Sequence, residues 1–340
     1  MQNSQPESRS KVSVAMITYN HEQFIEQALD SVLMQQVDFD YEIVIGDDLS
    51  QDRTREILRD YHARYPEKIH LLLYETKQGP GGNIYQVLNN CQGEYIALLE
   101  GDDYWTSPEK LQVQVNYLDQ WTNCSLCFHS IQRLLQDEQA FVSLPSSAKE
   151  NLQYGIDDLL NGVIFPRTCT VVCRAKLFEF PERIKELHHI DTLLWCLFAA
   201  HGFLGYIGGI QAVYRVHSTG MWQSASEFQR WLRDLKTHEY LNEYFNYIYN
   251  NNFKIRTSYM IISIEYRAIG QDKEAYYYFR KSFFGKNLEP INMKWLFYSV
   301  LAAFSYPLYK NVRIVSRSLF RTYLKIRSIH QRMMATRQKA

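Results

Sequence analysis

The sequence predicts an α/β protein with a mostly parallel sheet flanked by helices, followed by a helical extension. Over roughly the first 120 residues, short apolar runs rich in β-branched residues alternate with segments of helical spacing. From about residue 224 onward, the pattern is mostly helical and rich in Tyr and Phe. A hydrophobic content of 46% over 340 residues lets most of the chain bury a core.

The expected elements follow one another in a regular order. Buried apolar runs predict strands at residues 11–17, 41–46, 69–74 and 95–99. Helical spacing predicts helices at residues 22–36, 54–65 and 84–91. We expect Ser107 to cap a further helix that Pro108 opens, and the segment 78–83 (QGPGGN) to be a turn-rich loop. Farther along, the patterns predict strands at 168–173 and 203–216, a helix at 190–200, and a helical hairpin from 256–269 and 272–284.

Polar side chains follow three of these strands, at the point where each strand ends. They are Thr18-Tyr19-Asn20, Asp47-Asp48 and Glu100-Gly101-Asp102-Asp103. Because ligands of parallel sheets bind beyond the carboxyl ends of the strands, we expect these groups to line one site. Helix capping could account for Asp47, Asp48 or Asp52, but the cluster at 100–103 precedes a helix that Ser107 already caps.

The carboxylate cluster at 100–103 predicts a bound cation. Hard oxygen ligands suit Mg²⁺ or Mn²⁺, and Mg²⁺ usually bridges a few carboxylates to substrate phosphates. The sequence has no P-loop pattern, and QGPGGN does not follow the first strand as a dinucleotide fingerprint would. We therefore expect a nucleoside diphosphate to be held through the metal.

Three segments resemble the inverting family 2 glycosyltransferases of the GT-A fold, a Rossmann-like architecture. They are VSVAMITYNHEQFIEQALDSVLMQQ, YEIVIGDDLSQDRT and GEYIALLEGDDYW, in the family's order and spacing, and later motifs extend the match to about residue 222. The resemblance implies a nucleotide-sugar-binding and catalytic domain at residues 1–223. Residues 224–340 would then form a helical extension with a basic, amphipathic, membrane-associating end.

The resemblance also implies which residues bind the donor. Thr18, Tyr19 and Asn20 match the loop that lines the nucleoside pocket. Asp48 matches the residue that hydrogen-bonds the base, and Asp102 matches the acid that contacts the ribose.

The same resemblance implies the metal ligands and the catalytic base. Asp103 would hold the metal, and His217, in YRVHSTGMW, would close over the metal and the diphosphate. Asp191, in HHIDTLLW, would take the proton of the acceptor hydroxyl, as inverting transfer requires. Simpler interpretations stay open: Asp191 could cap a helix, and His217 could be a hydrogen-bonded histidine at a strand end.

The sequence departs from the family pattern at two places. Glu100 stands where the family usually has Asp, and GGNIYQVLNN lacks a basic residue that the family often has there.

The formal net charge is zero, but the charges are segregated. Residues 254–340 carry 17 basic and 4 acidic side chains, a net charge of +13, which leaves −13 on residues 1–253. The six cysteines are scattered, and the strand-like surroundings of Cys124, Cys127, Cys169 and Cys173 favour buried thiols over a zinc site. Residues 1–10 lack the apolar core of a secretory signal, so we expect a reducing, cytoplasmic setting.

The C-terminal end predicts contact with an anionic membrane surface. Residues 296–309 are apolar and aromatic, but too few to span a bilayer. Residues 310–340 contain nine basic side chains and no acidic one, and basic residues recur every four positions from Arg313 to Lys325. This stripe is typical of a helix lying on the inner face of the cell membrane, with a helix packed against the body as the simpler alternative. No recognised nucleic-acid-binding motif is present, so we do not expect nucleic acid as a partner.

Together these features predict a metal-dependent inverting glycosyltransferase. We expect it to move a sugar from a UDP-linked donor to a hydroxyl of a glycan or a lipid-linked acceptor, in cell-surface polysaccharide synthesis. One alternative is a non-catalytic nucleotide- or glycan-binding protein of the same fold. Another is a sugar nucleotidyltransferase, which would usually carry a Gly-rich loop with a basic residue where this sequence has TYNHEQF.

Overall fold

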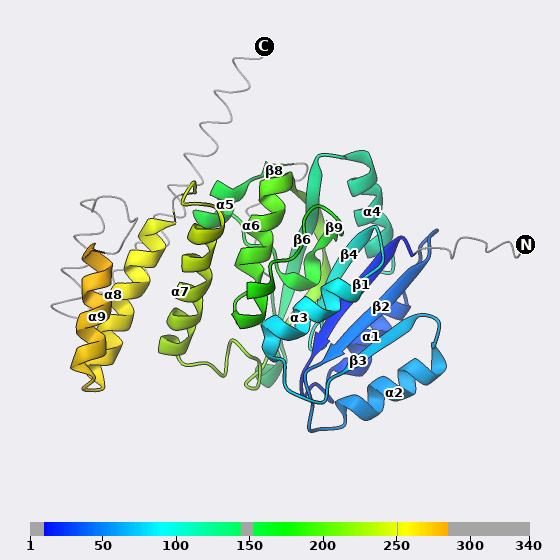
Figure 1. Cartoon of the computed structure of the whole chain (residues 1–340). Coiled ribbons are helices and arrows are strands. Elements are labelled where there is room, and N and C mark those ends of the chain that lie inside the picture. The colour runs from blue at the N-terminus through cyan, green and yellow to red at the C-terminus, as the bar shows by residue number, and fades with distance from the viewer. Residues whose placement is uncertain (1–9, 144–151, 250, 285–340) are drawn as a thin grey trace, which may run out of the picture. The chain divides into compact units, whose positions relative to one another are not determined.

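A computed structural model describes residues 10–143, 152–249 and 251–284. They fall into two compact units (Figure 1). The first unit holds the described residues up to Gly155 and those from Pro166 to Gln223. The second holds Ile156–Phe165 and the described residues from Ser224 onward. The predicted boundary after residue 223 separates a catalytic part from a membrane-associating part. This division of functions stays a prediction.

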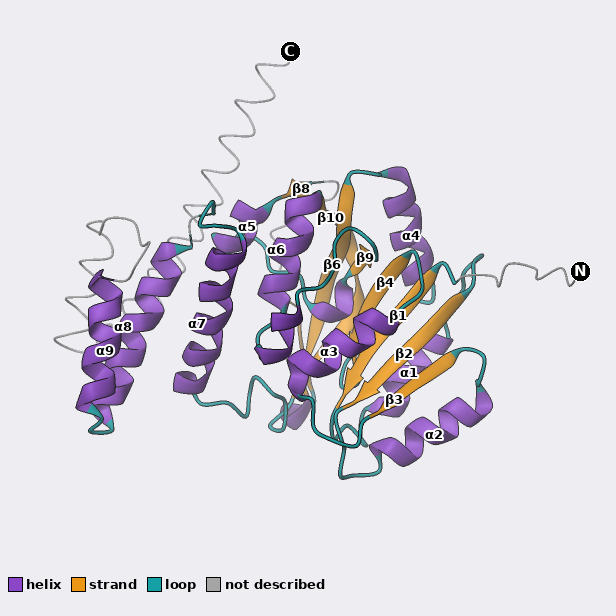
Figure 2. Ribbon diagram, in the orientation of Figure 1, coloured by secondary structure: helices purple, strands orange, loops and turns teal. Residues whose placement is uncertain are grey.

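The first unit is built on one sheet with the strand order β3-β2-β1-β4-β9-β6-β10-β5 (Figure 2). Its parallel part consists of β1 (Val12–Thr18), β2 (Tyr41–Asp47), β3 (Ile69–Leu73) and β4 (Tyr95–Glu100). In the register of β1 with its neighbours, Thr18 lies opposite Asp47 and Ile17 opposite Glu100. The polar ends of these strands therefore meet at one edge, and the prediction of a mostly parallel α/β sheet is confirmed.

The remaining strands extend this sheet with mixed directions. β9 (Val172–Arg174) is antiparallel to both β4 and β6 (Cys124–Leu135). β10 (Phe203–Val216) is parallel to β6 and antiparallel to β5 (Tyr104–Trp105). β7 (Ala140–Ser143) pairs with β6, and β8 (Gln153–Tyr154) with β10. Short 3₁₀ turns are η1 (Gln136–Glu138), η2 (Thr168–Thr170) and η3 (Glu182–Glu186).

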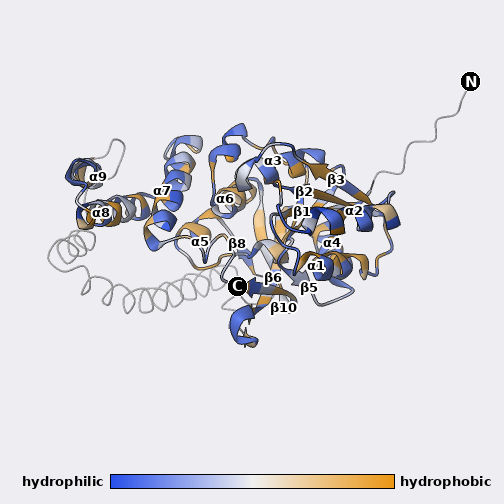
Figure 3. Ribbon diagram, turned by 90° about the horizontal axis from the view of Figure 1, so that it is seen from below, coloured by the Kyte–Doolittle hydropathy of each residue, from blue (hydrophilic) through white to orange (hydrophobic). Residues whose placement is uncertain are grey.

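Helices cover both faces of the sheet. α1 (Ile25–Leu33), α2 (Thr54–Arg64) and α4 (Lys110–Gln120) share a core cluster with Val12, Val14 and Met16 of β1. Because side chains alternate along a strand, Ala15 and Ile17 point to the opposite face, where α3 (Gly79–Asn90) and α6 (Asp191–His201) lie. Figure 3 shows β1 and β2 coloured mainly as hydrophobic between these two helical layers.

The expectation of a loop at residues 78–83 is wrong, because α3 begins at Gly79 and includes most of this segment. Pro80 is tolerated in the first turn, where its missing N–H would have had no helical partner. Gly81 is required by close packing, since a Cβ there would lie 2.1 Å from the carbonyl oxygen of Ile184. Gly81 thus serves a helix start that approaches η3.

Two further local expectations need correction. Glu109 occupies the N-cap position of α4, and Ser107 Oγ only accepts a hydrogen bond from the Glu109 N–H at 3.3 Å. The expected strand at 168–173 is a 3₁₀ turn followed by the short strand β9. Cys124, Cys127, Cys169 and Cys173 are buried free thiols, as expected from their strand-like surroundings.

The second unit is helical in its described residues. It contains α5 (Ile156–Leu160), α7 (Glu227–Tyr244), α8 (Asn252–Ala268) and α9 (Asp272–Phe284). α8 and α9 form the expected helical hairpin, and Leu235, Ile255, Tyr259 and Ile262 form a buried cluster. Among the residues described, no helix has the length and apolar character needed to cross a membrane. The predicted membrane-binding segment at 296–340 lies outside the described residues.

Candidate active site

The loops that follow β1 and β2 are joined by hydrogen bonds between their backbones and side chains. The Asn20 N–H donates to Ser50 Oγ at 2.9 Å, and the Gln51 N–H donates to Asn20 Oδ1 at 2.8 Å. The His21 N–H donates to Thr54 Oγ1 at 2.9 Å. Asn20 has a positive φ of 54°, a conformation that asparagine tolerates better than most residues. The predicted nucleoside loop is therefore held in one conformation.

Tyr19 is the exposed member of this loop, with 38% of its surface accessible. The Nζ atom of Lys77 lies 3.5 Å from the centroid of its ring. Thr18, the first residue of the predicted pocket, is buried, and its hydroxyl faces His21 Nδ1 at 3.1 Å. Tyr19 is thus the member of the three that offers an open ring face.

The two aspartates at the end of β2 are bound by groups of the protein itself. Asp47 is fully buried, accepts hydrogen bonds from the Ser50 N–H and hydroxyl, and pairs with Arg55. Asp48 Oδ1 accepts the N–H of Gln78 at 2.6 Å and that of Gly79 at 3.1 Å. The first N–H groups of α3 therefore converge on Asp48, which explains the helix start in the glycine-rich segment.

The carboxylates at the end of β4 lie close together around Gly101. A Cβ on Gly101 would lie 2.7 Å from Thr18 Oγ1, so only glycine fits this turn. Asp103 is 1% exposed, and its Oδ1 accepts the backbone N–H of Arg215 at 2.8 Å. Burial, followed by the neighbouring carboxylates, raises the pKa of Glu100 and of Asp103 well above their ordinary values. Like charges are thus crowded here without full compensation.

Asp102 differs from its neighbours because two histidines face it. Its Oδ2 lies 3.0 Å from His217 Nε2 and 3.7 Å from His21 Nε2. Burial alone would raise the pKa of Asp102, but His21 and the hydrogen bond with His217 lower it below the ordinary value. His217 is oriented in turn by Thr219, whose Oγ1 lies 2.8 Å from its Nδ1. Burial lowers the pKa of His21, against the opposing effect of Asp102.

Arg215 is a site residue that the sequence analysis did not single out. Arg215 is 5% exposed, and its guanidinium donates to the backbone oxygen of Asp102 at 2.6 Å and contacts Gln27. It also lies over the rings of Phe24 and Tyr104, at 5.0 and 4.6 Å from their centroids. A basic residue two positions before His217, inside a buried strand, was the signal available in the sequence.

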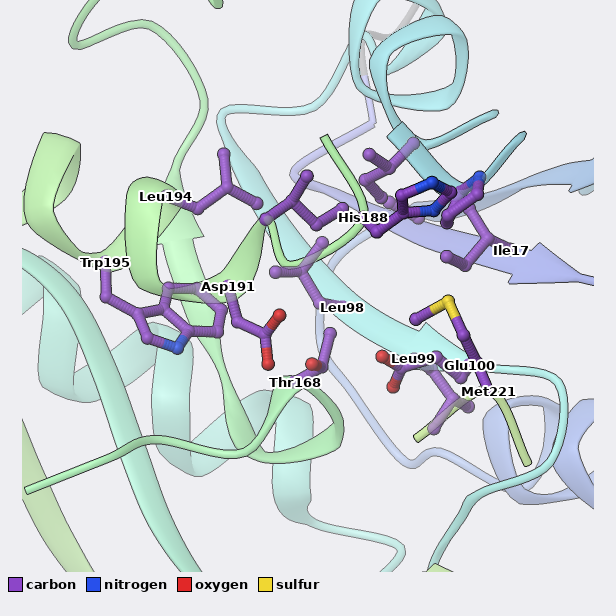
Figure 4. A pocket seen from close by; sticks show the side chains of 14 residues that line it. Ile17, Leu98, Leu99, Glu100, Thr168, His188, Asp191, Leu194, Trp195 and Met221 are labelled. Carbon is purple, nitrogen blue, oxygen red and sulfur yellow. The ribbon is translucent and has the colours of Figure 1, made fainter. Parts of the chain in front are cut away.

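Asp191 is the first residue of α6 and lines a cavity of about 50 Å³ (Figure 4). Glu100, Thr168, His188 and Met221 line the same cavity. Asp191 is among the carboxylates that raise the pKa of Glu100, so the two acids lie within electrostatic reach. The structure therefore brings the predicted base to the carboxylate cluster from a distant part of the sequence.

Asp102 and His217 provide a pair of atoms that fits a divalent cation. Their separation of 3.0 Å is about that of adjacent ligands on an octahedral ion with bonds of roughly 2.1 Å. Thr219 holds the remaining nitrogen of His217, as the supporting residues of metal ligands commonly do. Within the described parts of the chain, no group of three or more His, Cys, Asp or Glu side chains is arranged to hold a metal. A cation here would need further ligands from a substrate. Asp103 as a metal ligand stays a prediction.

Residues 13–170 match the model of glycosyl transferase family 2. This stretch of the chain is therefore similar to that family. The match includes the loops after β1, β2 and β4, whose contacts were described above.

Relatives of known sequence extend the similarity beyond the family model. An uncharacterized protein of Mycobacterium tuberculosis is 35% identical over 228 residues, which are 67% of this chain and 65% of that protein. The chain thus spans just under two thirds of that relative. Bacillus subtilis TuaG, whose provisional name is teichuronic acid biosynthesis glycosyltransferase, is 29% identical over 223 residues, covering 64% of this chain and 84% of TuaG.

Solved structures share the fold. S. aureus TarS in complex with UDP-GlcNAc matches with a TM-score of 0.52 and 18% identity, over 78% of this chain and 89% of that one. The mannosyltransferase PcManGT of Pyrobaculum calidifontis, in complex with GDP-Man and Mn²⁺, matches with a TM-score of 0.50 and 15% identity, over 90% and 87%. This chain therefore shares the GT-A fold that the sequence predicts.

Proposed function

We propose that this family 2 domain transfers a sugar from a UDP-linked donor to a hydroxyl of a glycan or a lipid-linked acceptor, with inversion. One observation carries the proposal: Asp191 and the Asp102–His217 pair reach the same end of the sheet from separate segments. The cavity that Asp191 lines also contains Glu100, two residues from Asp102. An isolated carboxylate and a carboxylate–histidine pair are the two functions that inverting transfer needs.

In the proposed reaction, Asp191 accepts the proton of the acceptor hydroxyl as its oxygen attacks the anomeric carbon. The new carbon–oxygen bond forms while the bond from that carbon to the diphosphate oxygen breaks. The electron pair of the broken bond leaves with the nucleoside diphosphate, and the sugar inverts. Asp191 suits this role because it lies apart from the Asp102–His217 pair, on the first turn of another helix.

The sequence predicts that Asp103 and His217 hold the metal and that Asp102 contacts the ribose. On the geometry we propose instead that Asp102 and His217 would hold Mg²⁺ or Mn²⁺, which when bound would stabilise negative charge on the departing diphosphate. Arg215 fixes the backbone of Asp102 by donating a hydrogen bond to its carbonyl oxygen. Thr219 keeps His217 Nε2 facing Asp102. The chain therefore preorganises the two atoms before any ligand arrives.

The nucleoside would lie on the loop of Thr18, Tyr19 and Asn20. Tyr19 offers its exposed ring, and Asn20 fixes the loop. Asp48 uses Oδ1 to bind the start of α3, and no described residue donates to its Oδ2, which would accept the N–H of the base. The proposal of UDP is supported by UDP-GlcNAc in the TarS structure.

The cellular role and location are also part of the proposal. The name of TuaG supports a function in cell-surface polysaccharide synthesis. Residues 1–223 would be catalytic, and residues 224–340 would hold the enzyme on the inner face of the membrane through their net positive end. That end lies outside the described residues, so its sequence alone supports this part.

The test is donor hydrolysis, in which water takes the place of the acceptor. The full chain, incubated with UDP-sugars and Mn²⁺, should release UDP, and removal of the metal with a chelator should stop the release. If the chain binds UDP-sugars but releases no UDP from them, even with acceptor glycans present, the protein is a binding module. If it neither binds nor cleaves them, the choice of donor is wrong.

A further inference from the structure

The cavity beside Asp191 is lined mainly by apolar residues, which the proposed reaction by itself does not require. We infer that it receives the acetamido group of the transferred sugar, so that the donor carries an N-acetylhexosamine. This inference rests on the proposed function, because that function places the sugar between Asp191 and the Asp102–His217 pair.

The position of the cavity follows from the direction of the displacement. In an inverting reaction the base and the leaving group lie on opposite sides of the anomeric carbon. The sugar must then occupy the space between Asp191 and Asp102. The cavity borders this space, since Asp191 and Glu100 both line it and Glu100 precedes Asp102 by two residues.

The wall of the cavity is mainly apolar. Ten of its fourteen lining residues are apolar, among them Ala15 and Ile17 of β1, Leu98 of β4, Ile84 of α3 and Leu194 of α6. Sugar hydroxyl groups placed against these ten apolar residues would be buried without hydrogen-bond partners, which is costly. A methyl group on the sugar would instead be stabilised by the same wall.

Four polar residues line the cavity, Glu100, Thr168, His188 and Asp191, and one buried oxygen among them has no hydrogen-bond partner among the described residues. Glu100 Oε2 is buried, and no described residue donates a hydrogen bond to it. Thr168 lies beside Glu100 on the same rim (Figure 4). A buried acceptor without a donor is unfavourable in the empty site, and an amide N–H on the ligand would satisfy it. The combination of an N–H with a neighbouring methyl group is that of an acetamido substituent.

The volume of the cavity favours an acetamido substituent over a single methyl group. One buried water needs roughly 10–15 Å³ of such space, so a cavity of about 50 Å³ has room for several groups of that size. The nitrogen, carbonyl and methyl groups of an acetamido substituent fill this space. The lone methyl of a 6-deoxy sugar would leave most of it empty.

The first measurement compares UDP-GlcNAc with UDP-glucose, which differ only in this substituent. The full chain with Mn²⁺ should hydrolyse UDP-GlcNAc with a kcat/KM at least roughly tenfold higher, and should bind it correspondingly tighter in calorimetry. Equal values, or a preference for UDP-glucose, would overturn the inference. Calorimetry with UDP alone separates the two claims: without UDP binding the proposed function fails and the inference with it, whereas normal UDP binding without the preference rejects the inference only.

The second measurement fills the cavity. Ala15→Val adds two methyl groups to its wall at a strand position that tolerates a β-branched residue. In this variant the preference for UDP-GlcNAc should fall to about twofold or less, while UDP binds as before. Leu194→Phe fills the cavity from α6 and serves if Ala15→Val does not fold.

Ala97→Val is the matched control. Ala97 precedes Leu98 on β4, so its side chain points to the opposite face of the sheet, and it belongs to the core cluster there. This variant should keep the preference of the wild-type chain, with thermal melting to confirm that it is folded. A folded Ala15→Val or Leu194→Phe variant with an unchanged preference contradicts the inference.

Discussion

Carboxylates stand at the ends of β2 and β4, on either side of β1, but their surroundings differ. At β2, Asp47 accepts hydrogen bonds from Ser50 and pairs with Arg55. Asp48 accepts the first N–H groups of α3. The charges at this end are therefore compensated by the protein itself.

At β4, three carboxyl groups lie within four residues and are compensated less completely. Asp102 faces His21 and His217, which carry positive charge only when protonated. The guanidinium of Arg215 contacts the backbone oxygen of Asp102. Burial accordingly raises the pKa of Glu100 and Asp103 well above their ordinary values.

The difference teaches how to tell a structural acid cluster from a ligand site. Both clusters end buried strands. Only the surrounding donors distinguish them: a cluster that the fold satisfies holds loops in place, whereas one left short of positive charge is suited to receive a cation.

The largest effect is expected from replacing Asp191, which lines the same cavity as Glu100 of the β4 cluster. Asp191→Asn should lower turnover of the nucleotide sugar by roughly 10²- to 10⁴-fold, the usual contribution of a positioned general base, and leave donor affinity nearly unchanged. Steady-state kinetics and calorimetry measure the two quantities. Asp272→Asn is the matched control, since Asp272 occupies the same first position of α9. Wild-type turnover in Asp191→Asn would place the base elsewhere.

Lys110 is a buried basic group to set beside the two acid clusters, and its hydrogen-bond partner, Gln114, is neutral. Its Nζ donates to Gln114 Oε1 at 2.6 Å and lies 4.2 Å from the Trp105 ring centroid, and burial lowers its pKa to about 7. Between pH 7 and the ordinary value of 10.5, the unfolded chain binds more protons than the folded one, so stability rises with pH across this window.

Replacing Lys110 should therefore help most at low pH. Lys110→Met should raise the free energy of unfolding by up to about 5 kcal/mol at pH 6, where the folded protein must bury the charged amine. The gain should shrink steadily towards pH 10. Urea unfolding at several pH values measures it, and a gain that does not vary with pH would show that the amine is neutral or solvated throughout.

The same substitution in the two acid clusters tests their difference directly. Asp47→Asn should lower the free energy of unfolding by about 2 to 3 kcal/mol, because Arg55 loses its buried partner. Asp102→Asn should change it by no more than about 1 kcal/mol, since the cost of burying the charge opposes most of the attraction by the histidines. Denaturant unfolding compares the two variants, and equal losses would remove the distinction.

The smallest effect is expected from the residue that orients His217. Thr219→Val removes the partner of His217 Nδ1 and should weaken Mn²⁺ binding in the presence of UDP by about 10- to 100-fold. Thr18→Val removes the corresponding partner of His21, which lies farther from Asp102, and should weaken it less. Titration of Mn²⁺ followed by electron paramagnetic resonance gives both affinities. A larger loss for Thr18→Val would make His21 the more important ligand.

Local patterns predicted the strands and their polar ends because period and polarity are properties of short segments. The start of α3 could not be predicted in this way. Its glycines suit a helix only because Ile184 and Asp48, distant in sequence, approach it closely. The family resemblance brought Asp191 and His217 into the predicted site, and the structure brings both to the carboxylates.

The sequence also could not predict which groups Asp102 and Asp103 contact. After β4 the chain turns at Gly101, so strand alternation no longer tells which way Asp102 and Asp103 point. The structure turns Asp102 towards His217 and Asp103 towards the backbone of Arg215. Arg215 carries only a weak signal in the sequence, because its place in a strand two residues before His217 does not reveal that it contacts Asp102.

The central claim is that the β4 cluster, and not the β2 cluster, holds the cation that binds the nucleoside diphosphate. Calorimetric titration of UDP with and without Mn²⁺ tests it most directly, in the wild-type chain and in folded Asp102→Asn. The account predicts that Mn²⁺ strengthens UDP binding to the wild-type chain. It also predicts that Asp102→Asn lowers the Mn²⁺-dependent affinity by at least roughly 100-fold, more than the loss of a supporting residue would cause. Unchanged Mn²⁺-dependent affinity in Asp102→Asn would contradict the account.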